Sequence, residues 1–421
     1  MGDHVRAGGR GGRSLRRWLR GFAWIGLLTL APLAIPAIAG AAGDLVYVGT
    51  YTGHGSQGIY AFRFDPASGE SVPLGLAART DQPSFLAVDP QGRFLYAANE
   101  IERFGNEPSG AVSVFALDRM SARLTLLQQV SSLGVEPAFV SLDRTARHLL
   151  VANYDVKNAN GGNSAVFPIG PDGRLGPRTA FVEESGSSVD PVRQAGPHPH
   201  SIQTTPDNRF VLITDLGRDK LLMFRFDETS GSLRPAAPGS VRAAPGAGPR
   251  HVAFAPSGRS VYVINELSST IAVFALDPGP GALSLRQTVP TVPGGFAGKN
   301  SAAEIAVDAA GRFLYVSNRG DDSLVVFRVD PDDGELTLVE RVSGGGRAPR
   351  HFAIDATGRW LFAANQGSNE VKLFRIDPAS GRLEPTARSW KVVSPVCVLI
   401  VPDRRPQASP ETLIPARSPA R

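Results

Sequence analysis

The chain has 421 residues and contains 46 glycines, 34 prolines and a single cysteine. Glycine and proline at this abundance argue against a mainly helical protein, and one cysteine excludes an intrachain disulfide. The formal net charge of +5 arises within residues 1–42, where six arginines outnumber one aspartate, so the rest is neutral and we expect neither nucleic acid nor an anionic membrane as a partner.

Residues 1–42 have the pattern of an export signal. An arginine-rich start leads into the apolar run Phe22–Leu30, and small residues follow at Ala37–Ala42. The stretch Ser14–Leu19 resembles a twin-arginine signal, although an ordinary signal with several arginines fits as well. An uncleaved anchor is the other alternative, but two prolines interrupt the apolar run. We predict an exported protein, periplasmic or secreted, with no stable membrane span after cleavage.

A two-stranded motif recurs along the rest of the chain, and Pro249–Phe254, a turn and Val261–Asn265 are its clearest copy. The residues that open the first strand are Pro83, Pro137, Pro199, Pro249, Ala302, Pro349 and Pro395. The residues that close the second strand are Thr50, Asn99, Asn153, Asp215, Asn265, Asn318 and Asn365. From Pro83 to Pro349, each opening residue precedes its closing residue by 16 positions. Constant hairpins joined by variable loops indicate structural repeats.

The motif is one half of a longer repeat. A third apolar strand follows it, as in Ile271–Phe274, then a turn rich in Asp, Pro and Gly, and then a more variable strand. Four strands in roughly fifty residues are typical of a propeller blade. Asp44–Thr50 is a second strand without a first, and Pro395–Ile400 is a first strand without a second, so their pairing would close a ring. We predict an all-β, seven-bladed β-propeller of four-stranded antiparallel blades over residues 43–401, followed by a disordered tail at residues 402–421.

Two positions of the repeat vary between blades and carry polar residues. The residues that follow the strand openings are Ser84, Ala138, His200, Arg250, Ala303, Arg350 and Val396. The residues that follow the strand closings are Tyr51, Glu100, Tyr154, Leu216, Glu266, Arg319 and Gln366. Because the innermost strands of a propeller begin at one mouth of its central channel, we expect these side chains to ring that mouth.

Four of these residues are chemically suited to one site. Arg250 and Arg350 present planar forks that match a carboxylate or a phosphate. His200 and Glu266 belong to the residue types that transfer protons near neutral pH. The opposing interpretation is that the arginines are solvated or ion-paired and that the histidine is structural. The shared position in the repeat favours one site.

Other histidines carry weaker signals. His198 and His200 resemble a metal-binding pair, but zinc requires three or four ligands and no further cluster supports it, so we predict no metal and no cofactor. His251 and His351 occupy the same position in two blades. Strand alternation points them away from the arginines that precede them, which favours a packing role.

Several stretches carry a resemblance to a known family. They are Tyr47–Thr52, Pro83–Leu86, Leu95–Glu100, Val151–Tyr154, Pro197–Ser201, Gly248–His251, Asn265–Glu266, Pro349–Phe352 and Ala364–Gln366. Across residues 44–401 the chain resembles the lactonase family of seven-bladed propellers, which includes bacterial 6-phosphogluconolactonases and fungal carboxy-cis,cis-muconate cyclising enzymes. The resemblance implies a channel-mouth site in which the matching residues are His200, Arg250, Glu266 and Arg350.

We therefore predict a metal-independent lactonase-type hydrolase that opens a small acidic lactone, carboxylated or phosphorylated. Arg250 and Arg350 would hold the anionic group and the developing oxyanion. Glu266 would act as the general base on water and His200 as its proton partner, with the two roles open to exchange. The alternatives are a carboxymuconate-type lactonising cyclase, which closes a lactone ring instead of opening one, and a non-catalytic ligand-binding or scaffold propeller. The export signal leaves the substrate open, because a cytosolic pentose-phosphate enzyme would not need one, and the oligomeric state is also open.

Overall fold

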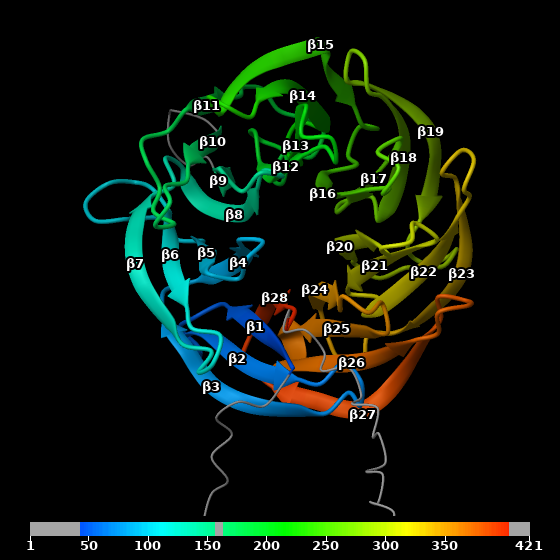
Figure 1. Cartoon of the computed structure of the whole chain (residues 1–421). Coiled ribbons are helices and arrows are strands. Elements are labelled where there is room, and N and C mark those ends of the chain that lie inside the picture. Colours follow the sequence, from blue (N-terminus) through cyan, green and yellow to red (C-terminus); the bar gives the residue numbers. More distant parts are fainter. Residues whose placement is uncertain (1–42, 156–162, 404–421) are drawn as a thin grey trace, which may run out of the picture. The chain divides into compact units, whose positions relative to one another are not determined.

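The computed structural model describes residues 43–155 and 163–403, which form seven four-stranded antiparallel sheets around a common axis (Figure 1). The predicted fold class is thereby confirmed. The predicted signal at 1–42 and residues 404–421 of the predicted tail lie outside the described residues. Within the described part of the chain, no helix is long and apolar enough to cross a membrane.

Each blade is a meander that runs from the axis to the outside. Apart from one short 3₁₀ helix, η1 (Gln366–Ser368), the described elements are strands. From the innermost to the outermost strand, the blades are β28 (Pro395–Val401), β1 (Asp44–Thr50), β2 (Gly58–Phe64), β3 (Ser71–Arg79); β4 (Pro83–Val88), β5 (Phe94–Asn99), β6 (Ala111–Leu117), β7 (Leu124–Ser131); β8 (Val135–Leu142), β9 (His148–Asp155), β10 (Asn163–Pro168), β11 (Ala180–Glu183); β12 (Pro199–Thr204), β13 (Phe210–Asp215), β14 (Lys220–Asp227), β15 (Ser232–Arg242); β16 (Pro249–Phe254), β17 (Ser260–Asn265), β18 (Thr270–Asp277), β19 (Ala282–Pro290); β20 (Ser301–Val307), β21 (Phe313–Arg319), β22 (Ser323–Val329), β23 (Leu336–Ser343); and β24 (Pro349–Ile354), β25 (Trp360–Asn365), β26 (Glu370–Ile376), β27 (Leu383–Lys391).

The ring closes as predicted, because β1 pairs antiparallel with β28. Leu45 lies opposite Val401 in this pairing. The Asp403 backbone N–H donates a hydrogen bond to the Asp44 carboxylate at 2.8 Å, and the Gly43 N–H donates to the Asp403 carboxylate at 3.1 Å. The two ends of the propeller therefore protect each other's strand edges.

Apolar side chains fill the spaces between neighbouring blades. Strands β13, β17 and β25 are buried along their whole length, whereas outer strands such as β15 and β19 consist almost entirely of half-buried and exposed residues. A typical cluster joins Leu45 and Tyr47 of one blade to Leu95 and Ala97 of the next. Seven such clusters lie between neighbouring blades, and burial of each large apolar side chain contributes about 2 kcal/mol to holding the blades together.

The predicted Asp-to-Gly turns lock adjacent blades together. The Tyr315 O–H on β21 donates to the Gly381 carbonyl, in the turn after β26, at 3.0 Å. Gly381 has a φ of +73°, and a Cβ there would collide with the Phe313 ring. Only glycine suits this position, both for its backbone conformation and for the space it leaves to the neighbouring blade.

A β-bulge begins most innermost strands and determines where the polar side chains point. On β16, Pro249 lies opposite Asn265 but His251 already lies opposite Ile264, so Arg250 is an extra residue in the ladder. The same irregularity occurs on β4, β8, β12 and β24. A bulge breaks the strict alternation of side chains. The prediction that His251 and His351 point away from the arginines that precede them assumed unbroken alternation. For His251 it is wrong, because a ring nitrogen of His251 lies 3.2 Å from Arg250 Nη1.

Candidate functional site

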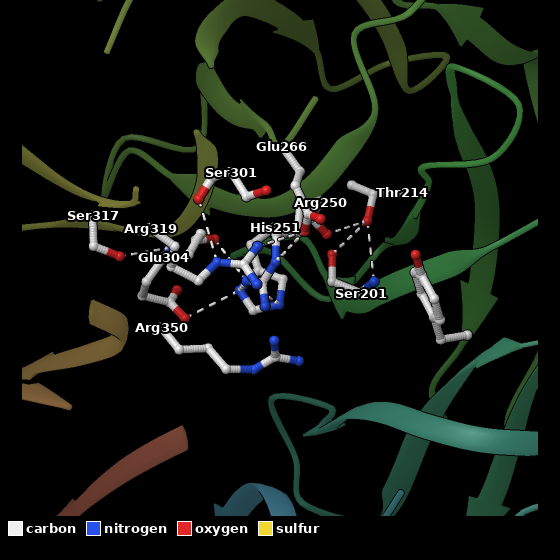
Figure 2. A network of polar contacts seen from close by, with 12 residues as sticks. Ser201, Thr214, Arg250, His251, Glu266, Ser301, Glu304, Ser317, Arg319 and Arg350 are labelled. Atoms are coloured by element: carbon white, nitrogen blue, oxygen red, sulfur yellow. Dashed lines mark hydrogen bonds and ion pairs between the residues drawn. The ribbon is translucent and has the colours of Figure 1, made fainter. Parts of the chain in front are cut away.

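Glu266 is the centre of an arginine cluster. It follows β17 directly, and its backbone N–H is held by the Gly248 carbonyl at 2.7 Å. Its buried carboxylate receives Arg250 Nε at 3.0 Å and Arg319 Nη2 at 2.8 Å, two residues labelled in Figure 2, and also Arg193 Nη2 at 2.7 Å. Burial alone would raise the pKa of Glu266, but the three guanidinium charges outweigh it and hold the pKa far below its usual range. Glu266 is therefore ionised at any ordinary pH.

Arg250 is fixed on several sides. Its Nη1 donates to the Ala303 carbonyl at 2.7 Å and lies 3.2 Å from a ring nitrogen of His251. Its own carbonyl accepts the Thr214 hydroxyl at 2.6 Å. Burial, together with the charges of neighbouring arginines, lowers the pKa of Arg250. This guanidinium is held rigidly in position and is only partly neutralised, which suits the stabilisation of a new negative charge.

Arg350 is linked to the carboxylate of Glu100 through the phenol of Tyr51. Its Nη2 donates to Tyr51 Oη at 2.7 Å, and the Tyr51 O–H donates to Glu100 Oε1 at 2.8 Å. Burial raises the pKa of Tyr51, so the phenol stays protonated and transmits the Glu100 charge only weakly. Glu100 Oε2 is buried and has no hydrogen-bond partner among the described residues. Arg350 therefore keeps much of its capacity to bind an anion.

His200 is buried beside this cluster. Its ring centre lies 5.2 Å from that of Tyr154 and 5.0 Å from that of His251. Its Nδ1 is buried and lacks a hydrogen-bond partner within the part of the chain that the structure describes. Burial and the charges of Arg250 and Arg350 bring the pKa of His200 well below 6.5. The imidazole is therefore neutral at pH 7.

His251, His351 and Glu304 form a second polar layer, which meets the arginines where His251 contacts Arg250. The sequence analysis did not assign this layer to the site. His251 Nδ1 and His351 Nε2 both approach Glu304 Oε2, at 3.1 and 3.3 Å. The Val398 N–H donates to His351 Nδ1 at 3.2 Å, so the proton of neutral His351 sits on Nε2 and faces Glu304. Burial raises the pKa of Glu304 and lowers that of His351 to about 4. Glu304 occupies the same repeat position in its blade as His251 and His351 in theirs. This shared position is the sequence signal that could have placed Glu304 with the two histidines.

Arg193 and Tyr154 complete the cluster from outside the inner strands. Arg193 Nη2 donates to Tyr154 Oη at 3.1 Å as well as to Glu266. His198 stacks on the Tyr154 ring at 4.7 Å, and its Nδ1 lies 2.7 Å from the Tyr154 carbonyl. His198 thus positions Tyr154, whose ring His200 also contacts, edge to face. The described residues contain no group of three or more His, Cys, Asp or Glu that could hold a metal.

The four predicted site residues are brought to one end of the innermost strands. Arg250 and Glu266 form an ion pair. The ring of His200 contacts the ring of His251, which in turn contacts the Arg250 guanidinium. The charge of Arg350 acts on both His200 and Arg250, which places it with them. Their roles stay predictions. Arg319 and Tyr51 occupy predicted rim positions, whereas Arg193 lies on a loop with no counterpart in the repeat, so no periodic signal could have found it.

Known proteins are similar to this chain along most of its length. Residues 45–400 match the family described as lactonase, 7-bladed beta-propeller. The 6-phosphogluconolactonase of Bacillus subtilis strain 168 is 37% identical over 306 residues, which are 73% of this chain and 83% of that protein. The solved periplasmic gluconolactonase of Pseudomonas aeruginosa superposes with a TM-score of 0.79 at 40% identity, covering 86% of this chain and 99% of that one. A putative 6-phosphogluconolactonase from Bacteroides fragilis gives a TM-score of 0.78 at 33% identity, covering 86% and 98%. The chain belongs to the lactonase family of seven-bladed β-propellers.

Proposed function

We propose that the protein hydrolyses a small lactone that carries an anionic group, a carboxylate or a phosphate. The observation that carries this proposal is an excess of positive charge at the site. Four arginines meet there, namely Arg193, Arg250, Arg319 and Arg350, against the carboxylates of Glu266, Glu100 and Glu304. Because burial raises the pKa of Glu304, this carboxyl group offsets less of the arginine charge than a free carboxylate would. A site with unbalanced guanidinium charge favours an anionic ligand.

The reaction opens an ester ring. Water attacks the lactone carbonyl carbon, the carbonyl oxygen becomes an oxyanion, the ring C–O bond breaks, and the leaving oxygen takes up a proton. Arg250 and Arg350 are placed to stabilise the oxyanion and the substrate's anionic group. The reverse path is a lactonising cyclisation through the same transition state.

The surroundings favour His200 as the group that accepts the proton from water. Both carboxylate oxygens of Glu266 are occupied by arginines, which makes this carboxylate a weak base. His200 Nδ1, by contrast, has no partner among the described residues. Its depressed pKa arises partly from Arg250 and Arg350, so a bound anion that neutralises them would raise that pKa and make the imidazole a better base. Glu266 then acts by holding the arginines in place.

The direct test is a panel of lactones with and without an anionic group, with acid release followed by a pH indicator. We expect faster hydrolysis than in buffer and a preference for the anionic members. If no lactone is hydrolysed although a lactone or its acid still binds, the protein is a binding propeller.

We also propose that no metal takes part in the reaction, because His198 is engaged with Tyr154. EDTA should therefore leave the rate of hydrolysis unchanged.

We further propose export to the periplasm or beyond, by way of residues 1–42. The support is the arginine-rich, apolar pattern of this segment and the description of the Pseudomonas aeruginosa relative as periplasmic. Fractionation of cells that express the full chain should place the protein outside the cytoplasm. Replacement of Arg16 and Arg17 by lysines tests the twin-arginine route, since retention in the cytoplasm is expected only for that route.

A further inference from the structure

Arg193 differs from the other arginines around Glu266 in how far it reaches solvent. Its side chain is 39% exposed, against 3% for Arg250 and 16% for Arg319. It therefore forms the outward side of the cluster. A substrate whose reacting carbonyl lies near Arg250 would extend its remote end towards Arg193.

The guanidinium of Arg193 has unused donors. Its hydrogen bonds to Glu266 and to Tyr154 Oη both come from Nη2. Within the residues that the structure describes, its Nε and Nη1 make no hydrogen bond. Glu266 would keep Arg250 and Arg319 as partners if Arg193 turned towards a ligand. Redirecting Arg193 thus leaves no buried charge unpaired, whereas moving Arg250 would also break its bond to the Ala303 carbonyl.

A buried aspartate holds the loop that presents Arg193. This loop runs from residue 184 to residue 198, between β11 and β12. The Asp219 carboxylate accepts four hydrogen bonds; its donors are Ser188 Oγ at 2.6 Å, Gln194 Nε2 at 2.8 Å, Gly246 N at 2.7 Å and Gly248 N at 2.7 Å. Two of these donors belong to the Arg193 loop and two belong to the segment that leads into Arg250. One side chain therefore fixes both arginines relative to each other.

We propose that Arg193 is a specificity-determining residue that binds the remote anionic group of the substrate, and that Asp219 is the positioning residue behind it. This inference rests on the proposed lactone hydrolysis and refines it, because it moves the substrate's anionic group to Arg193 and leaves the oxyanion to Arg250 and Arg350. The site would then select lactones by a carboxylate or phosphate distant from the reacting carbonyl, while the ring-opening chemistry depends on Arg250, Arg350 and His200.

The test compares gluconolactone with its 6-phosphate, which share the reacting ring and differ in the remote anion. We expect the wild-type kcat/KM to be higher for the phosphorylated lactone. Arg193→Gln should lower kcat/KM for that substrate about 10- to 100-fold, mainly through KM, as expected for loss of a charge-assisted contact. For gluconolactone itself the change should stay below about threefold. Arg347→Gln, which removes an exposed loop arginine bonded to the Gly367 carbonyl, is the matched control and should change neither value.

Each outcome is decisive. Equal losses on both substrates would overturn the inference, since Arg193 would then act through Glu266, and so would a wild type without preference for the phosphorylated lactone. A wild type that hydrolyses neither would overturn the proposed function itself. Asp219→Asn supplies a second variant that should fold, because Asn369 occupies the equivalent turn with a φ of +56°, close to the +52° of Asp219. It should shift the substrate preference in the same direction as Arg193→Gln, whereas Asp322→Asn, at the same turn position two blades on, should leave the preference unchanged.

Discussion

The outer turns and the channel-mouth ends of the blades follow opposite rules. At the outer turns, the same contact repeats from blade to blade: Tyr47, Tyr96, Tyr262 and Tyr315 each donate to a turn carbonyl of the next blade, and Trp360 does so through its indole N–H. At the mouth, each of the two variable positions holds five residue types across the seven blades. Periodic positions join the blades, and the positions that break the period hold the candidate site residues.

The largest effect should come from the aperiodic region. His200→Asn should reduce kcat about 100- to 10,000-fold, the contribution of a general base, with little change in the thermal midpoint. Steady-state acid release from the preferred lactone measures it. His54→Asn, at an exposed histidine, is the control. A reduction of less than tenfold would remove His200 from the reaction.

Glu266→Gln should act on the whole cluster. Removing the carboxylate leaves three arginines without their common counter-ion, which for a buried ion pair costs about 3–5 kcal/mol of unfolding free energy. We expect a lower urea midpoint together with a raised KM. Glu70→Gln, which breaks an exposed pair with Arg388, should cost less than about 1 kcal/mol. If Glu266→Gln is as stable as the wild type and loses only kcat, Glu266 is the base and His200 its partner.

The second polar layer should make stability depend on pH. His351 has a folded pKa of about 4 against about 6.5 when unfolded, so below pH 6.5 the unfolded state binds a proton that the folded state does not. Stability is therefore lost as the pH falls from 6.5 towards 4, by about 3 kcal/mol for this residue. The raised pKa of Glu304 acts in the opposite direction and offsets part of that loss.

His351→Gln should flatten this dependence, because the amide keeps a donor towards Glu304 but does not titrate. Thermal midpoints between pH 4 and pH 7 measure it, with His54→Gln as the control. His251, which Glu304 and Arg250 also contact, still titrates in the variant, so a residual slope is expected. An unchanged slope would show that His351 is accessible to protons in the folded protein.

The smallest effect should come from the periodic region. Tyr315→Phe removes the hydroxyl that meets the Gly381 carbonyl and should cost about 1 kcal/mol of unfolding free energy, with activity unchanged. Urea unfolding measures it. Tyr60→Phe, whose hydroxyl accepts only an exposed backbone N–H at 3.3 Å, should be nearly neutral. A loss of activity in Tyr315→Phe would contradict the separation of the two regions.

Sequence reasoning reached the fold because each blade repeats the same local chemistry. The Asp-to-Gly turns and the constant hairpin length carry the architecture, and ring closure followed from the unmatched strands at the two ends. Convergence of Arg250 and Glu266 followed from their shared position in the repeat. The orientation of His251 did not follow from its position in the repeat, because a bulge depends on the hydrogen-bond register between two strands, which the residue types do not reveal.

The contribution of Arg193 was beyond sequence reasoning for a different reason. Its loop has no periodic counterpart, and the place of the side chain depends on capture by Asp219, which lies 26 residues further along the chain. Long-range capture of a loop is a tertiary event that local pattern does not encode. Glu304 differs in this respect, because it occupies the repeat position of the two histidines that it contacts, His251 and His351, and that shared position was a usable signal.

The most direct test of the account is acid release from gluconolactone 6-phosphate by the purified protein and by Arg250→Gln. The account predicts hydrolysis well above the spontaneous rate for the wild type and a fall of at least about 100-fold in kcat/KM for the variant, as for loss of an oxyanion donor. A wild type no faster than buffer, or a variant as fast as the wild type, would contradict it.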